Sequence, residues 1–275
     1  MNIKQAISHY TALFSDISDT AHLDAECLIM HITNTSRAGL FSHPETVLTK
    51  QQENKLEVLA ARRSKGEPIA YLTGYKEFWD LNLKVSSDVL IPRPETECLI
   101  EWILTHFSNQ HALKVADLGV GSGAIALALA KERPNWKIHA TDISKSALKI
   151  AEENAKAHKI NNVSFFKGQW CEALPENDYD IIVSNPPYIP NNDAHLENLQ
   201  FEPQTALAAG SDGLDAIKII VHQAKDYLKK SGVLIFEHGY DQRDSVLTLL
   251  NKAGYKKTEN HTDLAGQPRF SLARK

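Results

Sequence analysis

The sequence has 275 residues, of which 43% are hydrophobic and 23% are charged, a composition typical of globular proteins. The formal net charge is -4 and there is no run of five or more basic residues, which disfavours a protein that binds long nucleic acid. The three cysteines are scattered, the N-terminus lacks an apolar signal-peptide core, and no stretch approaches the roughly 20 apolar residues of a membrane helix. These features predict a cytoplasmic protein that does not contact a membrane.

Residues 1–75 are predicted to form a small bundle of three or four helices. Apolar residues recur every three or four positions over residues 3–14 and again over residues 23–32, which is the period of an amphipathic helix. A third helix is predicted to begin at Thr49, because Thr49 and Gln52 have the spacing of a capping box.

Residues 76–94 differ in character from the segment before them. Two short strands joined by a tight turn are predicted within residues 77–85. Pro92 and Pro94 follow, and prolines this close together exclude a regular helix or strand interior. The segment is therefore predicted to be a hairpin and a stiff connector, with a helix resuming over residues 95–107.

Strand-like and helix-like segments alternate after residue 113. The predicted strands are residues 113–118, 137–141, 163–167, 181–184, 233–237 and 255–259, with a further one at 268–272. The predicted helices are residues 124–131, 145–158, 214–229 and 243–252. This alternation predicts an α/β fold, in which βαβ units build a mostly parallel sheet with helices on both faces.

A glycine-rich segment, Asp117-Leu118-Gly119-Val120-Gly121-Ser122-Gly123, joins the first of these strands to a helix. Glycines allow a sharp turn and close approach of the backbone to a ligand, and ligands of open parallel sheets bind beyond the carboxyl ends of the strands. The spacing also fits a dinucleotide fingerprint. Asp117 favours S-adenosylmethionine over a nicotinamide cofactor, because a carboxylate suits a cationic amino acid and repels a pyrophosphate.

Asp142 ends the second strand, about 20 residues beyond the glycine loop, where an acidic residue can bind ribose hydroxyls. The alternative is structural, since Asp142 or Ser144 could cap the helix that follows. Ribose binding is the favoured interpretation because of the position of Asp142 relative to the glycine loop.

The segment Asn185-Pro186-Pro187-Tyr188 follows a buried strand. Proline has a fixed φ and no N–H, so the turn is stiff and its carbonyl groups have few competing donors. A nitrogen bonded to a π system is a weak nucleophile, and two acceptors that hold its hydrogens can direct its lone pair at a methyl donor. The Asn185 side-chain oxygen and the Pro186 carbonyl are the predicted acceptors, and Tyr188 is predicted to stack on the planar group. The alternative is a structural loop in which the prolines end the strand.

Further motifs occur along the chain. They are Glu67-Pro68-Ile69-Ala70-Tyr71-Leu72-Thr73-Gly74, Leu90-Ile91-Pro92-Arg93-Pro94-Glu95-Thr96-Glu97, Phe201-Glu202-Pro203 and Asp263-Leu264-Ala265-Gly266-x-x-Arg269. With the glycine loop and the Asn-Pro-Pro-Tyr segment, they make the chain resemble the HemK-like (PrmC) peptide chain release factor glutamine methyltransferases over about residues 3–273.

The resemblance implies a fold, a cofactor and a substrate. It implies an N-terminal helical substrate-docking domain at residues 1–75, a β-hairpin linker at 76–94 and a seven-stranded Rossmann-like class I methyltransferase domain at 95–275. The implied activity is transfer of a methyl group from S-adenosylmethionine to the side-chain amide nitrogen, N5, of a glutamine. That glutamine is the one in the Gly-Gly-Gln loop of class I peptide chain release factors.

The charge argument for Asp117 and the resemblance together assign the site residues, and no metal ligand is predicted. The residues predicted to contact the cofactor are Asp117, Gly119, Val120, Gly121, Ser122, Gly123, Asp142, Trp170 and Asn185. Those predicted to contact the substrate are Asn185, Pro186, Pro187 and Tyr188, of which Asn185, Pro186 and Tyr188 are predicted to be catalytic. Without the resemblance, Trp170 would be assigned to the core.

Two other functions remain open at this point. Asn-Pro-Pro-Tyr also occurs in enzymes that methylate exocyclic amines of flipped or single-stranded nucleobases, but the near-neutral helical bundle resembles a protein-docking module more than a nucleic-acid reader. A non-catalytic cofactor-binding scaffold is disfavoured because the Asn-Pro-Pro-Tyr side chains are intact. Glu237-His238-Gly239 ends a strand on the ligand side and is interpreted mainly as structural lining.

Overall fold

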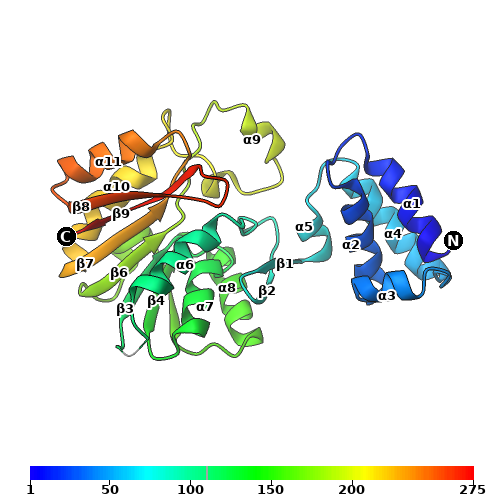
Figure 1. Cartoon of the computed structure of the whole chain (residues 1–275), viewed down its shortest axis with the longest axis horizontal. Coiled ribbons are helices and arrows are strands. Elements are labelled where there is room, and N and C mark those ends of the chain that lie inside the picture. The colour runs from blue at the N-terminus through cyan, green and yellow to red at the C-terminus, as the bar shows by residue number, and fades with distance from the viewer. Residues whose placement is uncertain (110) are drawn as a thin grey trace. The chain divides into compact units, whose positions relative to one another are not determined.

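The computed structural model of the chain describes residues 1–109 and 111–275. It divides into two compact units, Met1–Tyr75 and Lys76–Lys275 (Figure 1). Among these residues, the first unit contains one apolar core and the second contains two. Across the described residues, no helix is both long enough and apolar enough to span a membrane.

The first unit is helical. Its helices are α1 (Ile3–Phe14), α2 (Ala21–Thr33), α3 (Arg37–Ser42), α4 (Lys50–Arg63) and α5 (Ile69–Thr73). Their apolar faces meet in a core that includes Phe14, Leu28 and Leu56, all almost fully buried. The predicted capping box is confirmed, since the side chains of Thr49 and Gln52 exchange hydrogen bonds with each other's backbone N–H at the start of α4. The short helices α3 and α5 bring the described helices to five, where three or four were predicted, because they are too short to show a helical period.

A hairpin of β1 (Tyr75–Phe78) and β2 (Leu81–Lys84) follows, and all of it except Tyr75 belongs to the second unit. One buried side chain, Asn154, fastens this hairpin to the unit. Its Oδ1 accepts from the Lys84 backbone N–H at 2.7 Å, and its Nδ2 donates to the carbonyl oxygens of Lys84 at 3.0 Å and Ser122 at 2.8 Å. Because Ser122 belongs to the glycine loop, the hairpin and the loop are held by the same amide group.

The centre of the second unit is a sheet of seven strands over the described residues. They are β3 (Lys114–Leu118), β4 (Lys137–Asp142), β5 (Val163–Lys167), β6 (Tyr179–Ser184), β7 (Leu228–Glu237), β8 (Lys256–Thr262) and β9 (Pro268–Arg274). The strand order is β5-β4-β3-β6-β7-β9-β8. The first five strands in this order are parallel, and β9 and β8 add antiparallel pairs at one edge. The predicted α/β class with a mostly parallel sheet is confirmed.

Helices cover both faces of the sheet (Figure 1). On one face lie α6 (Thr96–His106), α7 (Ala124–Glu132) and α8 (Lys145–Ala157); on the other lie α10 (Asp215–Tyr227) and α11 (Arg243–Lys252). Neighbouring strand residues point to opposite faces, so Ile181 packs in the first core and Ile182 in the second. The remaining short elements are η1 (Trp170–Ala173), α9 (His195–Asn198) and η2 (Gln204–Ala206).

The predicted boundary between the helix at residues 214–229 and the strand at residues 233–237 is wrong, because the strand begins five residues earlier, at Leu228. The helix expected over residues 214–229 ends at Tyr227, and Leu228 already pairs with Tyr179 as the first residue of β7. Leu228 is 2% exposed, so burial in the sheet determines its conformation more strongly than its helix propensity does.

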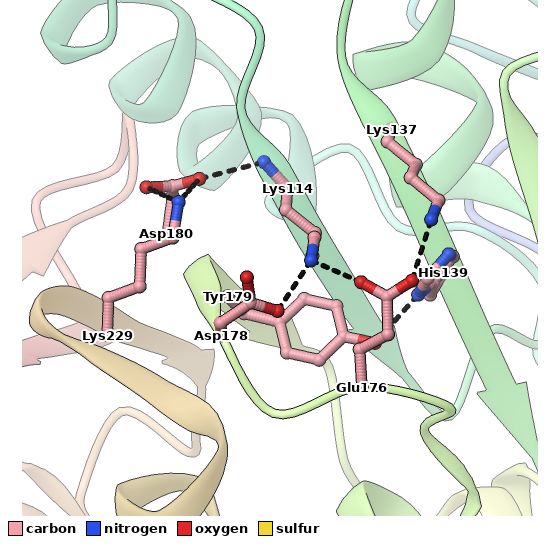
Figure 2. A network of polar contacts seen from close by, with 8 residues as sticks. All are labelled: Lys114, Lys137, His139, Glu176, Asp178, Tyr179, Asp180 and Lys229. Carbon is pink, nitrogen blue, oxygen red and sulfur yellow. Dashed lines mark hydrogen bonds and ion pairs between the residues drawn. The ribbon is translucent and has the colours of Figure 1, made fainter.

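Charged side chains pair with one another at the amino edge of the sheet (Figure 2). Lys114, the first residue of β3, contacts Glu176 and Asp178, and Lys137 at the start of β4 donates to Glu176 at 2.7 Å. These hydrogen bonds lower the pKa of Glu176 to about 2. Behind them, the buried His139 ring hydrogen-bonds the Tyr179 hydroxyl at 2.7 Å. Because water reaches these partly exposed pairs, we expect each to add little to stability.

Candidate active site

The opposite, carboxyl edge of the sheet contains a cavity of about 480 Å³ within the second unit. The strands β3, β4, β5 and β6 all end there, as expected for a ligand site of an open parallel sheet. The predicted site residues that line the cavity are Asp117, Gly119, Val120, Gly121, Ser122, Asp142, Trp170, Asn185 and Pro187. Segments that lie far apart in the sequence are therefore brought to one cavity by the strand order.

Three predicted residues are not part of the cavity lining: Gly123, Pro186 and Tyr188. Gly123 has a φ of 93°, and a Cβ on it would lie 2.8 Å from Leu127 Cδ1. The close packing at the start of α7 therefore explains why position 123 is a glycine. Pro186 and Tyr188 belong to the turn that holds Asn185.

The glycine loop is held by hydrogen bonds to the end of β4. The N–H groups of Gly119 and Val120 both donate to the Thr141 carbonyl at 2.9 Å, and the Gly121 N–H donates to Asp142 Oδ2 at 3.0 Å. Gly119 has a φ of 76°, a conformation that favours glycine. The loop backbone is thus fixed without any ligand.

The two possible roles of Asp142 are now separated by the geometry. The helix cap of α8 is Ser144, whose Oγ accepts from the Ala147 N–H at 3.2 Å. Asp142 instead accepts from Gly121 and, through Oδ1, from the Ser144 N–H at 2.8 Å. Burial raises the pKa of Asp142, and the backbone hydrogen bonds act against that rise. Each carboxylate oxygen has a second lone pair, so Asp142 can still accept from ribose hydroxyls.

Asp117 is a buried carboxyl group with spare hydrogen-bonding capacity. Its Oδ2 accepts from the Ala126 N–H at 3.0 Å, whereas Oδ1 is buried and has no hydrogen-bond partner in the part of the chain that the structure describes. Burial raises the pKa of Asp117 to about 7. An unpaired carboxylate oxygen in a cavity wall is costly, and a ligand ammonium group would remove that cost.

Trp170 forms another part of the wall. Its φ is 48°, and its carbonyl accepts from Thr141 Oγ1 at 3.1 Å, which holds the strained backbone. A Cβ on Gly119 would lie 3.3 Å from the Trp170 ring, so the indole lies against the loop where glycine leaves room. Its Nε1 is buried without a partner among the described residues. An indole face and two acidic groups fit a ligand that carries an aromatic base, a ribose and a cationic amino acid.

The Asn185 side chain lies in a hydrogen-bonded chain that the sequence did not predict. Its Nδ2 donates to Thr96 Oγ1 at 3.2 Å, and Thr96 donates to Glu237 Oε2 at 2.6 Å. The Tyr188 hydroxyl donates to the other carboxylate oxygen of Glu237 at 3.0 Å. Glu237, first interpreted as structural lining, therefore has specific partners. Its position at the end of a buried parallel strand, on the ligand side, was the available signal.

Another buried carboxylate joins two segments of the cavity wall. Glu202 accepts from Arg93 Nη2 at 2.5 Å and from the Ile91 N–H at 3.0 Å. Residues 87–93 and 203–208 both contribute to the lining. The ion pair thus holds together two of the motifs on which the resemblance was based.

Comparisons with known proteins identify both parts of the chain. The family described as methyltransferase small domain matches residues 98–201, and the family described as PrmC N-terminal domain matches residues 5–74. The fold is that of the class I methyltransferases. A methyltransferase from Pyrococcus furiosus superposes with a TM-score of 0.55 at 18% identity, over 82% of this chain and 98% of that one. The hMettl16 catalytic domain in complex with an RNA hairpin gives 0.60 at 15% identity, over 90% of each chain.

Curated relatives are similar over the whole length. A release factor glutamine methyltransferase of Coxiella burnetii is 54% identical over 100% of this chain and 99% of its own. That of Escherichia coli is 41% identical over 99% of this chain and 97% of its own. The chain belongs to the release factor glutamine methyltransferase family, and its cofactor is S-adenosylmethionine.

Replacing Asp142 with alanine is expected to weaken the binding of S-adenosylmethionine by about 1–3 kcal/mol, the scale for leaving polar groups unpaired. Titration calorimetry measures the effect. Thr49→Ala is the control: it removes the side-chain cap of α4, so it should lower the free energy of unfolding by about 1 kcal/mol. It should leave affinity almost unchanged, because Thr49 does not line the cavity. Unchanged affinity in Asp142→Ala would remove Asp142 from the site.

The affinity for S-adenosylmethionine is also expected to depend on pH through Asp117. With its pKa near 7 in the free protein, Asp117 must lose a proton to pair with a cationic amino group at lower pH. Affinity should therefore fall about tenfold from pH 8 to pH 6. Asp117→Asn should bind weakly at every pH in this range and lose the dependence. A flat profile for the wild-type chain would contradict the pairing.

Proposed function

We propose that this chain transfers the methyl group of S-adenosylmethionine to the side-chain amide nitrogen of the glutamine in the Gly-Gly-Gln loop of class I peptide chain release factors. Membership of the release factor glutamine methyltransferase family supports the substrate, because the relatives carry that name over their full length. We place its action in the cytoplasm, where release factors work on ribosomes.

The observation that carries this proposal is the position of Asn185 in the cavity wall with its Nδ2 already engaged by Thr96. The side-chain oxygen is then the atom left to accept from a substrate amide. Pro186 supplies a carbonyl from the next residue. Two acceptors of this kind suit an NH₂ group, which has two hydrogens to donate.

The chain's own residues act by orientation. When bound, the cofactor supplies an electrophilic methyl group on a sulfonium. Asn185 and the Pro186 carbonyl hold the two amide hydrogens so that the nitrogen lone pair is directed at that methyl group. Tyr188 supports the turn that carries Asn185 through its hydrogen bond to Glu237. The N–C bond forms as the bond between that methyl group and sulfur breaks, with its electron pair remaining on sulfur. The substrate nitrogen then becomes acidic and releases one of its two hydrogens as a proton to water, so no anionic base is needed before attack.

A direct test uses the full chain with labelled S-adenosylmethionine and, in separate reactions, a purified class I release factor, DNA and RNA. The expected result is label on the release factor alone, with mass mapping of one methyl group to the Gly-Gly-Gln glutamine. Label on a nucleobase amine, or on another residue of the factor, would refute the proposed function.

Replacing Asn185 with alanine is expected to lower turnover on the release factor roughly 100-fold, the scale for losing one preorganised polar contact in a transition state. Cofactor affinity should change little, because most of the proposed cofactor contacts lie elsewhere. Asn185→Asp should lower turnover while cofactor binding is kept or tightened, since the added charge favours the sulfonium over the charge-dispersed transition state. Asn192→Ala, at an exposed position, is the control. Wild-type turnover in Asn185→Ala would refute the role of this residue.

We also propose that the helical unit, residues 1–75, docks the protein substrate. The cavity is lined by residues of the second unit alone, which supports this division of labour. A chain beginning at Lys76 is expected to keep its cofactor affinity and its activity on a short Gly-Gly-Gln peptide, and to lose most of its kcat/KM on the intact release factor. Circular dichroism checks that it folds. Full activity on the intact factor would exclude the docking role.

A further inference from the structure

Four side chains next to the cavity form one continuous hydrogen-bonded chain. Asn185 follows β6, Thr96 is the first residue of α6, and Glu237 is the last residue of β7. Tyr188 completes the chain from the same turn as Asn185. Thr96 and Glu237 are 3% and 1% exposed, so water does not compete for these bonds. The cavity lining includes Thr96 and Asn185 but not Glu237.

The direction of each bond follows from the chemistry of the groups. An ionised carboxylate only accepts, so both hydroxyls that face Glu237 must donate to it. The distance of 2.6 Å from Thr96 Oγ1 to Glu237 Oε2 is that of a hydroxyl bound to an ionised acceptor. The Thr96 hydroxyl hydrogen is thereby used, and its oxygen can only accept. The group that Asn185 turns towards Thr96 must then be its NH₂.

We propose that Glu237 is a positioning residue that acts through Thr96 to fix which way the Asn185 amide is turned, so that its oxygen faces the substrate. The inference rests on the proposed function, because it concerns how that site holds a substrate NH₂ group. Glu237 does not touch the substrate. It determines the direction of the hydrogen bonds that run from Glu237 through Thr96 to Asn185. Tyr188 donates to the other oxygen of Glu237 and is held by the same carboxylate.

Burial of the Glu237 carboxylate is energetically unfavourable, and the positioning role explains why a carboxylate is found at this position. Burial raises the pKa of Glu237, and the hydrogen bonds from Thr96 and Tyr188, together with the charge of Arg269, oppose that rise. Arg269 is itself paired with Asp263 at 3.0 Å. A neutral residue at position 237 would avoid the cost of desolvation, but it would not force both hydroxyls to donate.

The test begins with Glu237→Gln in the full chain, assayed on a release factor. A glutamine can accept from only one of the two hydroxyls, so the direction of the Thr96 hydroxyl is no longer forced. Where the glutamine accepts from Tyr188 it donates to Thr96, which turns the Thr96 hydroxyl and then the Asn185 amide the wrong way round. We expect kcat to fall roughly 10- to 100-fold, the range seen when outer hydrogen-bond partners of metal-binding side chains are lost. Affinity for S-adenosylmethionine should stay within about twofold, because Glu237 lies outside the cavity lining.

The decisive variant is the double substitution Glu237→Gln with Asn185→Asp. It reverses the direction of both hydrogen bonds that link positions 237, 96 and 185. The amide introduced at position 237 would donate to Thr96, Thr96 would donate to one oxygen of the new carboxylate, and the other oxygen would face the substrate. The double variant is expected to have a higher kcat than either Glu237→Gln or Asn185→Asp alone. A kcat equal to the product of the two separate losses would overturn the proposal, because a purely structural role for Glu237 gives no rescue.

Thr96 provides an independent pair of variants should Glu237→Gln not fold. Thr96→Ser keeps the hydroxyl, and Thr96→Val keeps the shape. We expect Thr96→Ser to retain kcat within about threefold and Thr96→Val to lose as much as Glu237→Gln is predicted to lose. Equal rates in the two variants would overturn the proposal.

Failure of the proposed function would look different. If the wild-type chain methylated a nucleobase amine and not the release factor, the proposed function would be refuted. The kcat values of the same variants, measured on that nucleobase amine, would still test the positioning role of Glu237, because a nucleobase amine must also present an NH₂ group to Asn185.

Discussion

Thr141 joins three of the four segments that build the carboxyl edge of the sheet. Its carbonyl accepts from two successive N–H groups, of Gly119 and Val120, and its hydroxyl donates to the Trp170 carbonyl. The residue is fully buried, so these bonds are shielded from water. The glycine loop, the carboxylate at the end of β4 and the strained indole turn after β5 are thereby fixed relative to one another.

Charged side chains are in different environments at the amino and the carboxyl ends of the strands. At the amino edge, lysines and carboxylates pair with one another in solvent, as for Lys114 and Asp178 at 2.5 Å. At the carboxyl edge, Asp117 and Asp142 are withdrawn from water and have raised pKa values. Burial of this kind lowers the stability of the unliganded chain, and a cationic ligand recovers that loss on binding. Selection for folding alone would replace such groups, so their presence points to binding.

Local rules predicted much of the fold because they depend on neighbouring residues. The Thr49 capping box, the helix over residues 243–252 and the strand over residues 163–167 are found as expected. The predictions were less accurate where contacts between residues far apart in the sequence determine the structure. Leu228 follows a helix but pairs with Tyr179 in the sheet, and nothing near it in the sequence indicates that partner. Likewise, Glu202 and Arg93 belong to recognisable motifs, but only the fold brings them together.

The interactions around Asn185 show a deeper limit of the sequence. A carboxamide has nearly the same shape in its two orientations, so close packing cannot choose between them. The choice requires a neighbour whose own hydrogen-bonding direction is already fixed, and that neighbour, Thr96, takes its direction from a carboxylate 141 residues further along the chain. The motif at residues 185–188 identifies the acceptor but not what orients it. A buried acid that only accepts hydrogen bonds can impose one direction on a chain of neutral groups, which explains why a site that handles a neutral amide contains a charge that faces away from it.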